Sequence, residues 1–520
     1  MHREIIKANI VVFIASFCTL VIELIAGRIM APFIGVSLYT WTSIIGVVLG
    51  GISVGAYLGG LLADRYPTQT TLGVLLILSG LGAFAISPLT TYLGGSQWNA
   101  SLMIRILIIT TLIFFAPSCV LGMISPVVVK LALNNLDKIG NIVGKIYAFS
   151  TLGSILGTFA TGFFLISWMG TRHILFSTGG ILMVSGVVFG GFLSRKKIFM
   201  AVGVGLFIPF LGVFYGHAFK PPLEGRTYFY KESNYYTIQL KKKDGTNKGS
   251  ALEALVLDHL IHSYTDLDDP LHLEYEYTRL YEELVRWQTK GKQSFRALFI
   301  GGGGYTFPRF LEAKYPGAQI DVVEIDPEVS RVARVFLGLP WNTTRIRTFN
   351  EDARWFVMNC KESGVYDFIF GDAFNDLSIP YHLTTKEFDL ELRRLLKPDG
   401  LYMVDVIDSF KKGLFIPAYI RTLEKVFGEE RVNLVIANTD INDMGISTYV
   451  VVASSKDLEQ EDFVEDMKRL GDTEVIALFY PQSLLQPYLK DHAPVILTDD
   501  YVPVDNLIAP IFEERYGYRK

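Results

Sequence analysis

The stretch that decides the fold is ALFIGGGGYTFPRFLEAKYPGAQIDVVEID, residues 297–326. Four apolar residues precede four consecutive glycines, and a second apolar run leads to the acidic residue Glu324. A buried strand, a glycine turn, a helix and a second strand that ends in an acid are typical of a nucleotide-type site in an α/β fold. The glycines let a ligand approach the backbone. A carboxylate at this spacing is placed to accept hydrogen bonds from ribose hydroxyls.

The alternation of helix and strand continues along the chain on both sides of this stretch. Further strands are expected within IRTFN, YDFIFGDAF and LYMVDVID, and helices within YEYTRLYEELVRWQ, PEVSRVARVFLG and TKEFDLELRRLL. Strands that alternate with helices predict a mostly parallel sheet with helices on both faces. We therefore assign residues 276–520 to a Rossmann-like, methyltransferase-type α/β domain.

Polar residues follow the predicted strands where each strand ends. Asp352 and Ala353 follow the third strand of the domain, and Asp372 follows the fourth. The carboxyl ends of parallel strands meet at one edge of the sheet, so these residues are expected near the glycines and Glu324. The predicted donor-binding residues are Gly301, Gly302, Gly303, Glu324, Asp352 and Ala353. A structural alternative remains, in which the glycines form tight turns and the acids cap helices.

The charge around the glycines indicates the kind of ligand. No Lys or Arg stands beside the glycine run, and the acids would repel a phosphate. The pattern therefore favours a nucleoside with a positive sulfonium, such as S-adenosylmethionine or a relative, over a dinucleotide.

The first 219 residues are almost free of charge inside long apolar runs. A transmembrane helix needs about 20 predominantly apolar residues. Seven stretches qualify, at about 8–30, 40–63, 71–95, 102–132, 141–168, 173–194 and 198–218. Glycines four residues apart, as at Gly51, Gly55 and Gly59, let helices approach closely. We expect a polytopic helical membrane domain over residues 1–219, with the lipid bilayer as its partner.

The basic residues of the membrane half conflict with the expected ligand. With the N-terminus and every second loop on one side, that side holds Arg3, Lys7, Arg65, Lys130, Lys138, Lys145, Arg195, Lys196 and Lys197, against Arg28, Arg105 and Arg172 opposite. Basic loops prefer the cytoplasm, so seven spans would put the C-terminal domain outside the cell. S-adenosylmethionine is made in the cytosol, however, and we expect a multi-pass protein of the cell membrane with its soluble domain in the cytoplasm.

The segment between these two halves and the overall composition add further limits. Residues 220–275 alternate aromatic or β-branched residues with polar ones and contain an Asp-Gly turn, which predicts a small β-domain. A net charge of −4 gives no support for a nucleic-acid partner. The three cysteines, Cys18, Cys119 and Cys360, are far apart and offer no metal cluster.

Several motifs together carry a resemblance to a known family. They are IGGGGYTFPRFL, VVEIDPEV, EDARWFV, GDAFNDLSIPYHLTTKEF, LKPDGLY, LTDDYVPVD and, near the N-terminus, YTWTSIIGVVLGGISVGAYLGGLLADR. The chain resembles spermidine synthase-like (polyamine aminopropyltransferase-like) proteins with a fused polytopic membrane domain. The resemblance implies a transferase of polyamine biosynthesis without a prosthetic group. Such an enzyme moves an aminopropyl group from decarboxylated S-adenosylmethionine to an amine or polyamine by direct displacement and releases methylthioadenosine.

The resemblance also implies roles for individual residues. The glycines approach the donor, Glu324 holds its ribose, Asp352 holds its adenine, and Asp372 is the catalytic residue that prepares the attacking amine. Soluble members read Gly-Gly-Gly-Asp-Gly, whereas this chain has Gly304 and Tyr305 in the last two places. The candidate acceptor or donor-tail pocket also departs from the family pattern, and its residues are Tyr236, Asp258, His262, Tyr277, Arg279, Asn375, Asp376 and Asp499. An Arg279 that faced the pocket would pair with a carboxylate and favour undecarboxylated S-adenosylmethionine.

Two other functions stay open at this stage. One is a different use of S-adenosylmethionine, either methyl transfer or cleavage to methylthioadenosine. The other is a non-catalytic transporter or sensor whose soluble domain binds a nucleoside. A homodimer is expected in each case.

Overall fold

The structure is a computed structural model in which the chain divides into two compact units. One unit comprises Met1–Pro222 with Glu232–Asn234, and the other comprises Leu223–Lys231 with Tyr235–Lys520. The residues described are 2–35, 37–94, 102–133, 139–192, 225–244, 251–258, 260–373, 379–437, 445–458, 460–471, 474–492 and 495–516.

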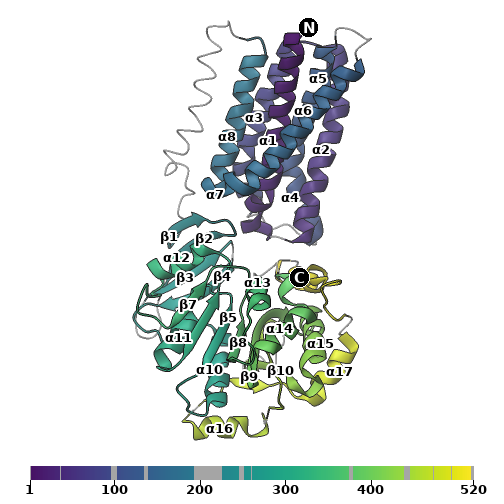
Figure 1. Cartoon of the computed structure of the whole chain (residues 1–520). Coiled ribbons are helices and arrows are strands. Elements are labelled where there is room, and N and C mark those ends of the chain that lie inside the picture. The colour runs from purple at the N-terminus through teal and green to yellow at the C-terminus, as the bar shows by residue number, and fades with distance from the viewer. Residues whose placement is uncertain are drawn as a thin grey trace. The chain divides into compact units, whose positions relative to one another are not determined.

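The N-terminal unit is a bundle of long apolar helices (Figure 1). Its elements are α1 (His2–Ile34), α2 (Leu38–Arg65), α3 (Gln69–Gly94), α4 (Leu102–Thr110), η1 (Thr111–Phe115), α5 (Ala116–Ala132), α6 (Ile139–Ala160), η3 (Thr161–Leu165), α7 (Ile166–Trp168) and α8 (Thr171–Phe189). Six helices among the described residues are long and apolar enough to cross a membrane, with α4 to α5 and α6 to α7 each continuous through a π-helical turn. The predicted N-terminal domain of long apolar helices is thus confirmed, while the seventh predicted span, 198–218, lies outside the described residues.

Glycines bring pairs of these helices into backbone contact. A Cβ atom on Gly55 would lie 2.0 Å from the carbonyl oxygen of Cys119, so α2 and α5 touch where only glycine fits. A Cβ atom on Gly153 of α6 would likewise lie 2.3 Å from the carbonyl oxygen of Phe13, so α6 touches α1 at this glycine. Gly46, on α2, is different, because a Cβ there would meet nothing within 4 Å. Small residues at such crossings gain close van der Waals packing, which drives helix association in lipid.

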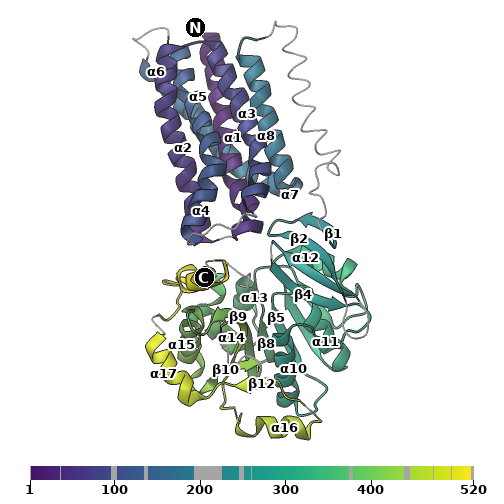
Figure 2. The ribbon, with the colours of Figure 1, turned by 180° about the vertical axis from the view of Figure 1, so that it is seen from behind.

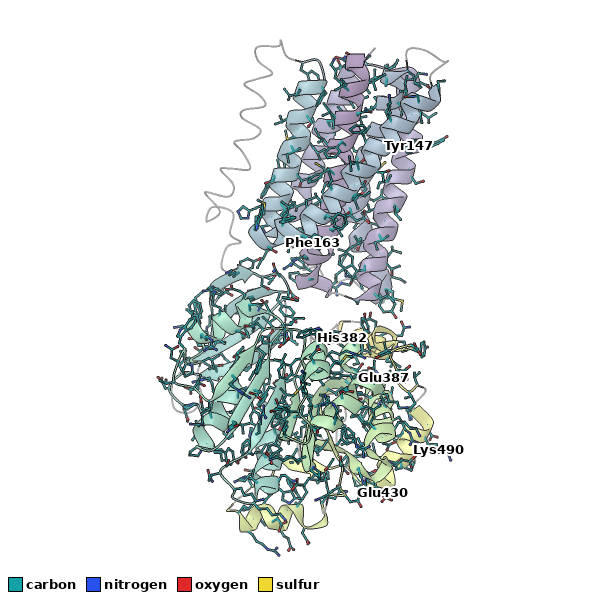
Figure 3. All side chains as sticks on the ribbon, viewed as in Figure 1. Tyr147, Phe163, His382, Glu387, Glu430 and Lys490 are labelled. Atoms are coloured by element: carbon teal, nitrogen blue, oxygen red, sulfur yellow. The ribbon has the colours of Figure 1, made fainter. Side chains whose placement is uncertain are left out.

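The outer surface of the bundle is apolar. Tyr147 and Phe163, labelled in Figure 3, are 66% and 67% exposed although both are large and aromatic. Exposed side chains of this kind suit contact with lipid rather than with water.

Gly55 and Gly46 form a matched pair for testing this packing. Gly55→Ala should lower the free energy of unfolding by about 1–3 kcal/mol, because the added methyl group overpacks the α2–α5 contact. Gly46→Ala should not destabilise the protein, since alanine favours a helix and meets no neighbour there. Thermal unfolding of the purified chain in detergent measures both. Equal unfolding temperatures for the two variants would contradict the assignment of this contact.

The C-terminal unit begins with a four-stranded sheet, as predicted for this segment. Its strands are β1 (Thr227–Glu232), β2 (Thr237–Lys243), β3 (Leu252–Leu257) and β4 (Leu260–Asp266), in the order β1-β2-β3-β4. Ile238 and Leu255 from this sheet are buried in the same hydrophobic core as Leu284 and Phe299 of the α/β part. The small sheet therefore shares one core with the sheet that follows it.

The larger sheet has eight strands and a Rossmann-like order. They are β5 (Arg296–Ile300), β6 (Gln319–Val323), β7 (Ile346–Phe349), β8 (Tyr366–Gly371), β9 (Leu396–Ser409), β10 (Val432–Ala437), β11 (Ile446–Ser454) and β12 (Ala477–Phe479). The order is β12-β10-β11-β9-β8-β5-β6-β7, and the five strands from β9 to β7 are parallel. Strand order reverses at β5, and ligands bind at such a reversal in open α/β sheets.

Helices cover both faces of the larger sheet (Figure 2). They are α10 (Glu276–Thr289), α11 (Thr306–Lys314), α12 (Pro327–Phe336), α13 (Ala353–Asn359), α14 (Lys386–Leu395), α15 (Phe415–Phe427), α16 (Phe463–Arg469), α17 (Gln482–His492) and α18 (Val504–Tyr516). On one face, Tyr281 of α10 packs against Phe370 of β8. On the other, Tyr419 of α15 bonds to Tyr402 of β9, with their hydroxyl oxygens 2.9 Å apart. The α/β architecture predicted from the sequence is confirmed.

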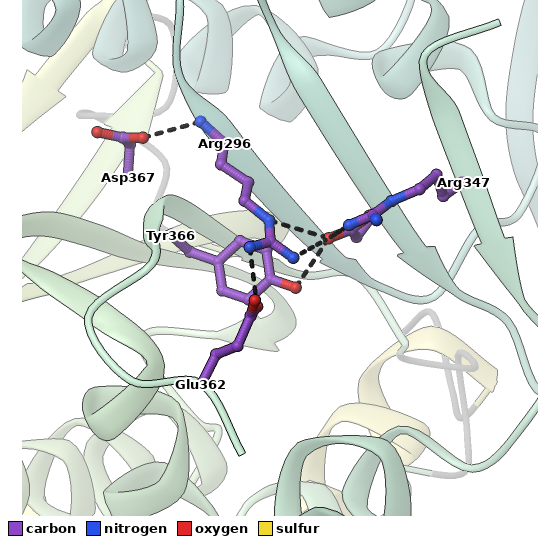
Figure 4. A network of polar contacts seen from close by, with 6 residues as sticks. Arg296, Arg347, Glu362, Tyr366 and Asp367 are labelled. Atoms are coloured by element: carbon purple, nitrogen blue, oxygen red, sulfur yellow. Dashed lines mark hydrogen bonds and ion pairs between the residues drawn. The ribbon is translucent and has the colours of Figure 1, made fainter. Parts of the chain in front are cut away.

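A buried ion network joins four neighbouring parallel strands (Figure 4). Asp321, in the middle of β6, accepts hydrogen bonds from Arg347 of β7 at 2.6 and 2.8 Å and from Arg296 of β5 at 3.2 and 3.3 Å. The Tyr366 hydroxyl of β8 donates to the same carboxylate at 2.9 Å. Burial of this charge is compensated by two cations and a hydroxyl, as a stable buried carboxylate requires.

Candidate active site

The glycine turn after β5 is shaped by a close approach of β5 to β8. Gly301 has φ +98°, and a Cβ atom there would lie 2.1 Å from the carbonyl oxygen of Asp372. No other residue fits this position. The backbone of the glycine turn therefore touches the backbone at the end of β8. This contact fixes the position of the Asp372 backbone relative to the glycines.

Glu324, at the end of β6, holds the turn from the other side. One of its carboxylate oxygens accepts hydrogen bonds from the backbone N–H groups of Gly302 at 2.9 Å and Gly303 at 3.3 Å. The other accepts from the N–H of Asp326 at 2.9 Å. Burial raises the pKa of Glu324, and the three N–H donors oppose that shift. A carboxylate offers about four acceptor positions, so backbone N–H groups already occupy most of them, two from the glycine turn and one from Asp326.

The two departures from the family glycine pattern have physical causes. A Cβ atom at Gly304 would lie 2.0 Å from the Ser263 hydroxyl oxygen of β4, so an aspartate does not fit there. Tyr305 has φ +57°, an uncommon conformation for a large residue. Its ring is fully buried beside Gly302, and its hydroxyl lies 3.0 Å from the Ser330 hydroxyl. Burial of this ring stabilises a left-handed backbone conformation. Glycine, the residue of the family pattern at this position, adopts that conformation without strain.

Asp372, which follows β8, lies beside a buried acid of the neighbouring strand, Asp405 of β9. The register that pairs Gly371 with Val404 makes these acids neighbours, and each carboxyl group shifts the pKa of the other. Burial raises the pKa of Asp372 to about 7, while the hydrogen bond from Tyr277, at 3.2 Å, opposes the shift. Asp405 was missed by the sequence analysis. Its signal was an acid inside the apolar run YMVDVI, on the strand beside the predicted catalytic residue.

Asp352 lies at the N-terminus of α13. One carboxylate oxygen accepts from the backbone N–H of Trp355 at 2.9 Å and caps the helix. The other lies 3.0 Å from the Nε2 atom of His382. His382, which is labelled in Figure 3, belongs to the short helix η5 (Tyr381–Leu383). Ala353 is the first residue of α13 and is buried. The sequence analysis did not single out His382, a lone histidine whose proximity to Asp352 appears only in the fold.

Among the predicted pocket residues, two tyrosines lie near the acids. Tyr277 donates to Asp372, as described above. Burial raises the pKa of Tyr236, and the charges of Glu324, Asp258 and Asp326 add to that shift.

The other predicted pocket residues have different surroundings. Asp258, which follows β3, accepts a hydrogen bond from the Thr237 N–H of β2 at 2.9 Å, and His262 is a half-buried residue of β4. Asp499 binds Arg354, with Oδ1 and Nη1 2.8 Å apart. Asn375 and Asp376 lie outside the described residues.

Arg279 is not brought to the strand ends. It is exposed and lines a separate cavity of about 430 Å³ with Glu282, Arg286 and Phe310. Residues two positions apart on a helix do not face the same way, so Tyr277 and Arg279 point to different surroundings. Within the described residues, no group of three or more His, Cys, Asp or Glu side chains is placed to hold a metal ion.

The sequence of this domain is similar to known proteins. Residues 281–460 match the family model described as spermine/spermidine synthase domain. A polyamine aminopropyltransferase of Vibrio vulnificus is 38% identical over 157 residues, which is 29% of this chain and 51% of that protein. Polyamine aminopropyltransferase 2 of Aquifex aeolicus is 23% identical over 468 residues, or 87% of this chain and 88% of that protein. An N-terminal histidine N-methyltransferase of Emericella nidulans is 37% identical over 135 residues, 25% of this chain and 23% of that protein.

These matches differ in their extent. The chain spans about half the length of the Vibrio vulnificus protein that it matches. The match to the family model includes the glycine turn, Glu324, Asp352, Asp372 and Asp405. It ends before Asp499 and begins after Tyr277, so part of the candidate acceptor pocket lies outside it.

The contact between Gly304 and Ser263 can be tested by a double-mutant cycle. Gly304→Ala should lower the free energy of unfolding by about 1–3 kcal/mol, because the methyl group overpacks the turn against β4. Ser263→Gly should cost about 1 kcal/mol, mainly from chain entropy. The double variant should be more stable than the sum of the two effects, since removing Ser263 makes room for the methyl group. Thermal unfolding in detergent measures the cycle, and strictly additive effects would contradict the contact.

Proposed function

We propose that this chain, whose C-terminal half carries a spermine/spermidine synthase domain, is a membrane-anchored aminopropyltransferase that uses decarboxylated S-adenosylmethionine. The observation that carries the proposal is the position of Asp372. A half-buried carboxyl group with a pKa near neutrality lies beside the glycine turn, inside the segment that matches the family. A general base is most effective when its pKa is close to the working pH.

The donor nucleoside would lie across the carboxyl ends of β5 and β6. The glycines leave room for it, and the remaining acceptor capacity of Glu324 would serve a ribose hydroxyl. Asp352 would reach the adenine amino group by exchanging its contact with His382. The sulfonium is positive, and the acids at this edge favour a cation over a phosphate.

The transfer follows from this arrangement in two balanced steps. Asp372, as a carboxylate, first takes a proton from the substrate ammonium group and leaves a neutral amine. The nitrogen lone pair then attacks the donor carbon next to sulfur, and the carbon–sulfur bond breaks with its electrons moving to sulfur. Methylthioadenosine leaves as a neutral thioether, and the product nitrogen carries the positive charge. Alignment of the two reactants supplies much of the rate.

The decarboxylated donor is supported by the position of Arg279. This residue lines a separate cavity, so it offers no partner to a donor carboxylate at the strand ends. Among the described residues, the groups that act on the pKa of Asp372 are Tyr277, Glu324 and Asp405, which suit a cationic aminopropyl group.

Methyl transfer from S-adenosylmethionine is the second candidate function. The observation that favours it is the similarity to the Emericella nidulans N-terminal histidine N-methyltransferase over 135 residues. Both reactions need the same nucleoside site and a base for an attacking nitrogen, and they differ in the group transferred.

Product analysis separates these functions. The purified full-length chain in detergent should convert decarboxylated S-adenosylmethionine to methylthioadenosine only when an amine such as putrescine is added. Asp372→Asn should lower this rate at least about 100-fold, since base catalysis is lost, while nucleoside binding is retained. Asp457→Asn is the control, because its exposed ion pair with Arg431 should contribute little.

Other products would overturn the proposal. S-adenosylhomocysteine formed from S-adenosylmethionine would establish the second candidate function. Methylthioadenosine formed without an amine would indicate cleavage. Binding of both donors without any product would exclude both enzymatic functions and leave a nucleoside sensor or transporter.

The C-terminal unit is proposed to face the cytoplasm, because the donor is a cytosolic metabolite. A green fluorescent protein fused to the C-terminus should therefore fluoresce in bacterial cells, and alkaline phosphatase at the same position should be inactive. Active phosphatase together with a non-fluorescent fusion would place the unit outside the cytoplasm. The basic loops predict that location if the chain crosses the membrane seven times.

A further inference from the structure

Asp405 is an acid in the middle of a buried strand. Its neighbours Val404 and Val406 are buried, and Asp405 itself is only 5% exposed. Its side chain lies on the face of β9 that is covered by α10, where the Tyr281 hydroxyl donates to its Oδ1 atom at 3.5 Å. Burial raises the pKa of Asp405 well above its usual range, and the charge of Asp372 adds to this shift.

The surroundings of the two acids contain other acids and hydroxyls. Tyr277 and Tyr281 face them from α10, and Glu324 acts on Asp372 from the end of β6. Among the described residues that influence either acid in this way, none is a cation. This contrasts with Asp321, whose carboxylate binds two arginines.

Two carboxyl groups in contact without a cation cannot both be ionised. A single proton, carried by one group and donated toward the other, removes the repulsion between these neighbouring acids. Asp405 is the more buried, whereas Asp372 is half-buried beside the glycine turn. The cost of burying a charge is therefore lower when Asp372 is ionised and Asp405 is neutral.

We infer that Asp405 is a positioning residue that stays protonated and donates a hydrogen bond to the Asp372 carboxylate, so that the pair presents one negative charge to the substrate amine. This inference rests on the proposed function. The Asp405 donor stabilises the charged form of Asp372 and keeps that base usable near neutral pH. Tyr281 fixes Asp405 by donating to one oxygen, which leaves the protonated oxygen to face Asp372.

Two substitutions separate the donor role from other roles. Asp405→Asn keeps a donor toward Asp372, so we expect a rate within about tenfold of the native protein and an acid limb of the pH–rate profile that stays near pH 7. Asp405→Leu removes the donor, so the pKa of Asp372 should rise. The acid limb should then move upward by about one pH unit, and the rate at pH 7 should fall about tenfold, the rate change that corresponds to such a shift.

Each other outcome of the kinetic test contradicts the inference. If Asp405→Asn is as inactive as Asp372→Asn, Asp405 itself moves the proton. If both Asp405 variants lose rate equally without any shift of the pH profile, its role is only structural. A native pH profile in Asp405→Leu would show that Asp372 needs no donor.

The proton on Asp405 can also be observed without turnover. Infrared spectra of the full chain, labelled with ¹³C-aspartate in detergent at neutral pH, should contain a protonated-carboxyl component that disappears in Asp405→Asn and remains in Asp372→Asn. Asp389, a fully buried acid whose pKa is also raised well above its usual range, supplies a component that stays in both variants. No change in Asp405→Asn would overturn the inference. If the infrared component is lost in Asp405→Asn as expected, but the protein forms no methylthioadenosine, then Asp405 is protonated and the proposed function is refuted instead.

Discussion

The close approach of β5 to β8 is the constraint on which the candidate site depends. The backbone of Asp372 passes so near Gly301 that no side chain fits between them, and this contact sets where the glycine turn begins. Glu324 completes the arrangement, because its buried carboxylate binds the N–H groups of the same turn. One short turn therefore fixes the two acids on either side of it, one at the end of β6 and one at the end of β8.

Two sets of acids in this unit differ in the groups that surround them. Asp321 is surrounded by Arg296, Arg347 and Tyr366, so its charge is neutralised and its contribution is to join strands. Asp372 and Asp405 have hydroxyls and each other instead, and burial raises both pKa values. Acids that lack a cation keep a proton near neutral pH and can exchange it with a substrate, which is a property of functional sites more than of structural ones.

The sequence predicted the order of elements well, because periodicity and glycine turns are local signals. It predicted, from their places after strands, that the glycines, Glu324 and Asp372 lie together, as they do in the structure. It did not identify Asp405 or His382, since their importance comes from neighbours brought near by strand register and by η5. Arg279 was misplaced for a related reason: its spacing from Tyr277 on α10 sets it on another side of the helix, beside a different cavity. The need for glycine at position 304 also comes from a tertiary contact, because the Ser263 hydroxyl of the smaller sheet leaves no room for a side chain there.

The central claim is that an adenosyl nucleoside binds over the glycine turn with its sulfur directed toward Asp372. An experimental structure of the full-length chain with methylthioadenosine bound tests this most directly. The account predicts ribose hydroxyls at Glu324, the adenine near Asp352 and the thioether sulfur on the side of the glycines that faces Asp372. A nucleoside bound elsewhere, or bound here with its sulfur directed away from Asp372, would contradict it.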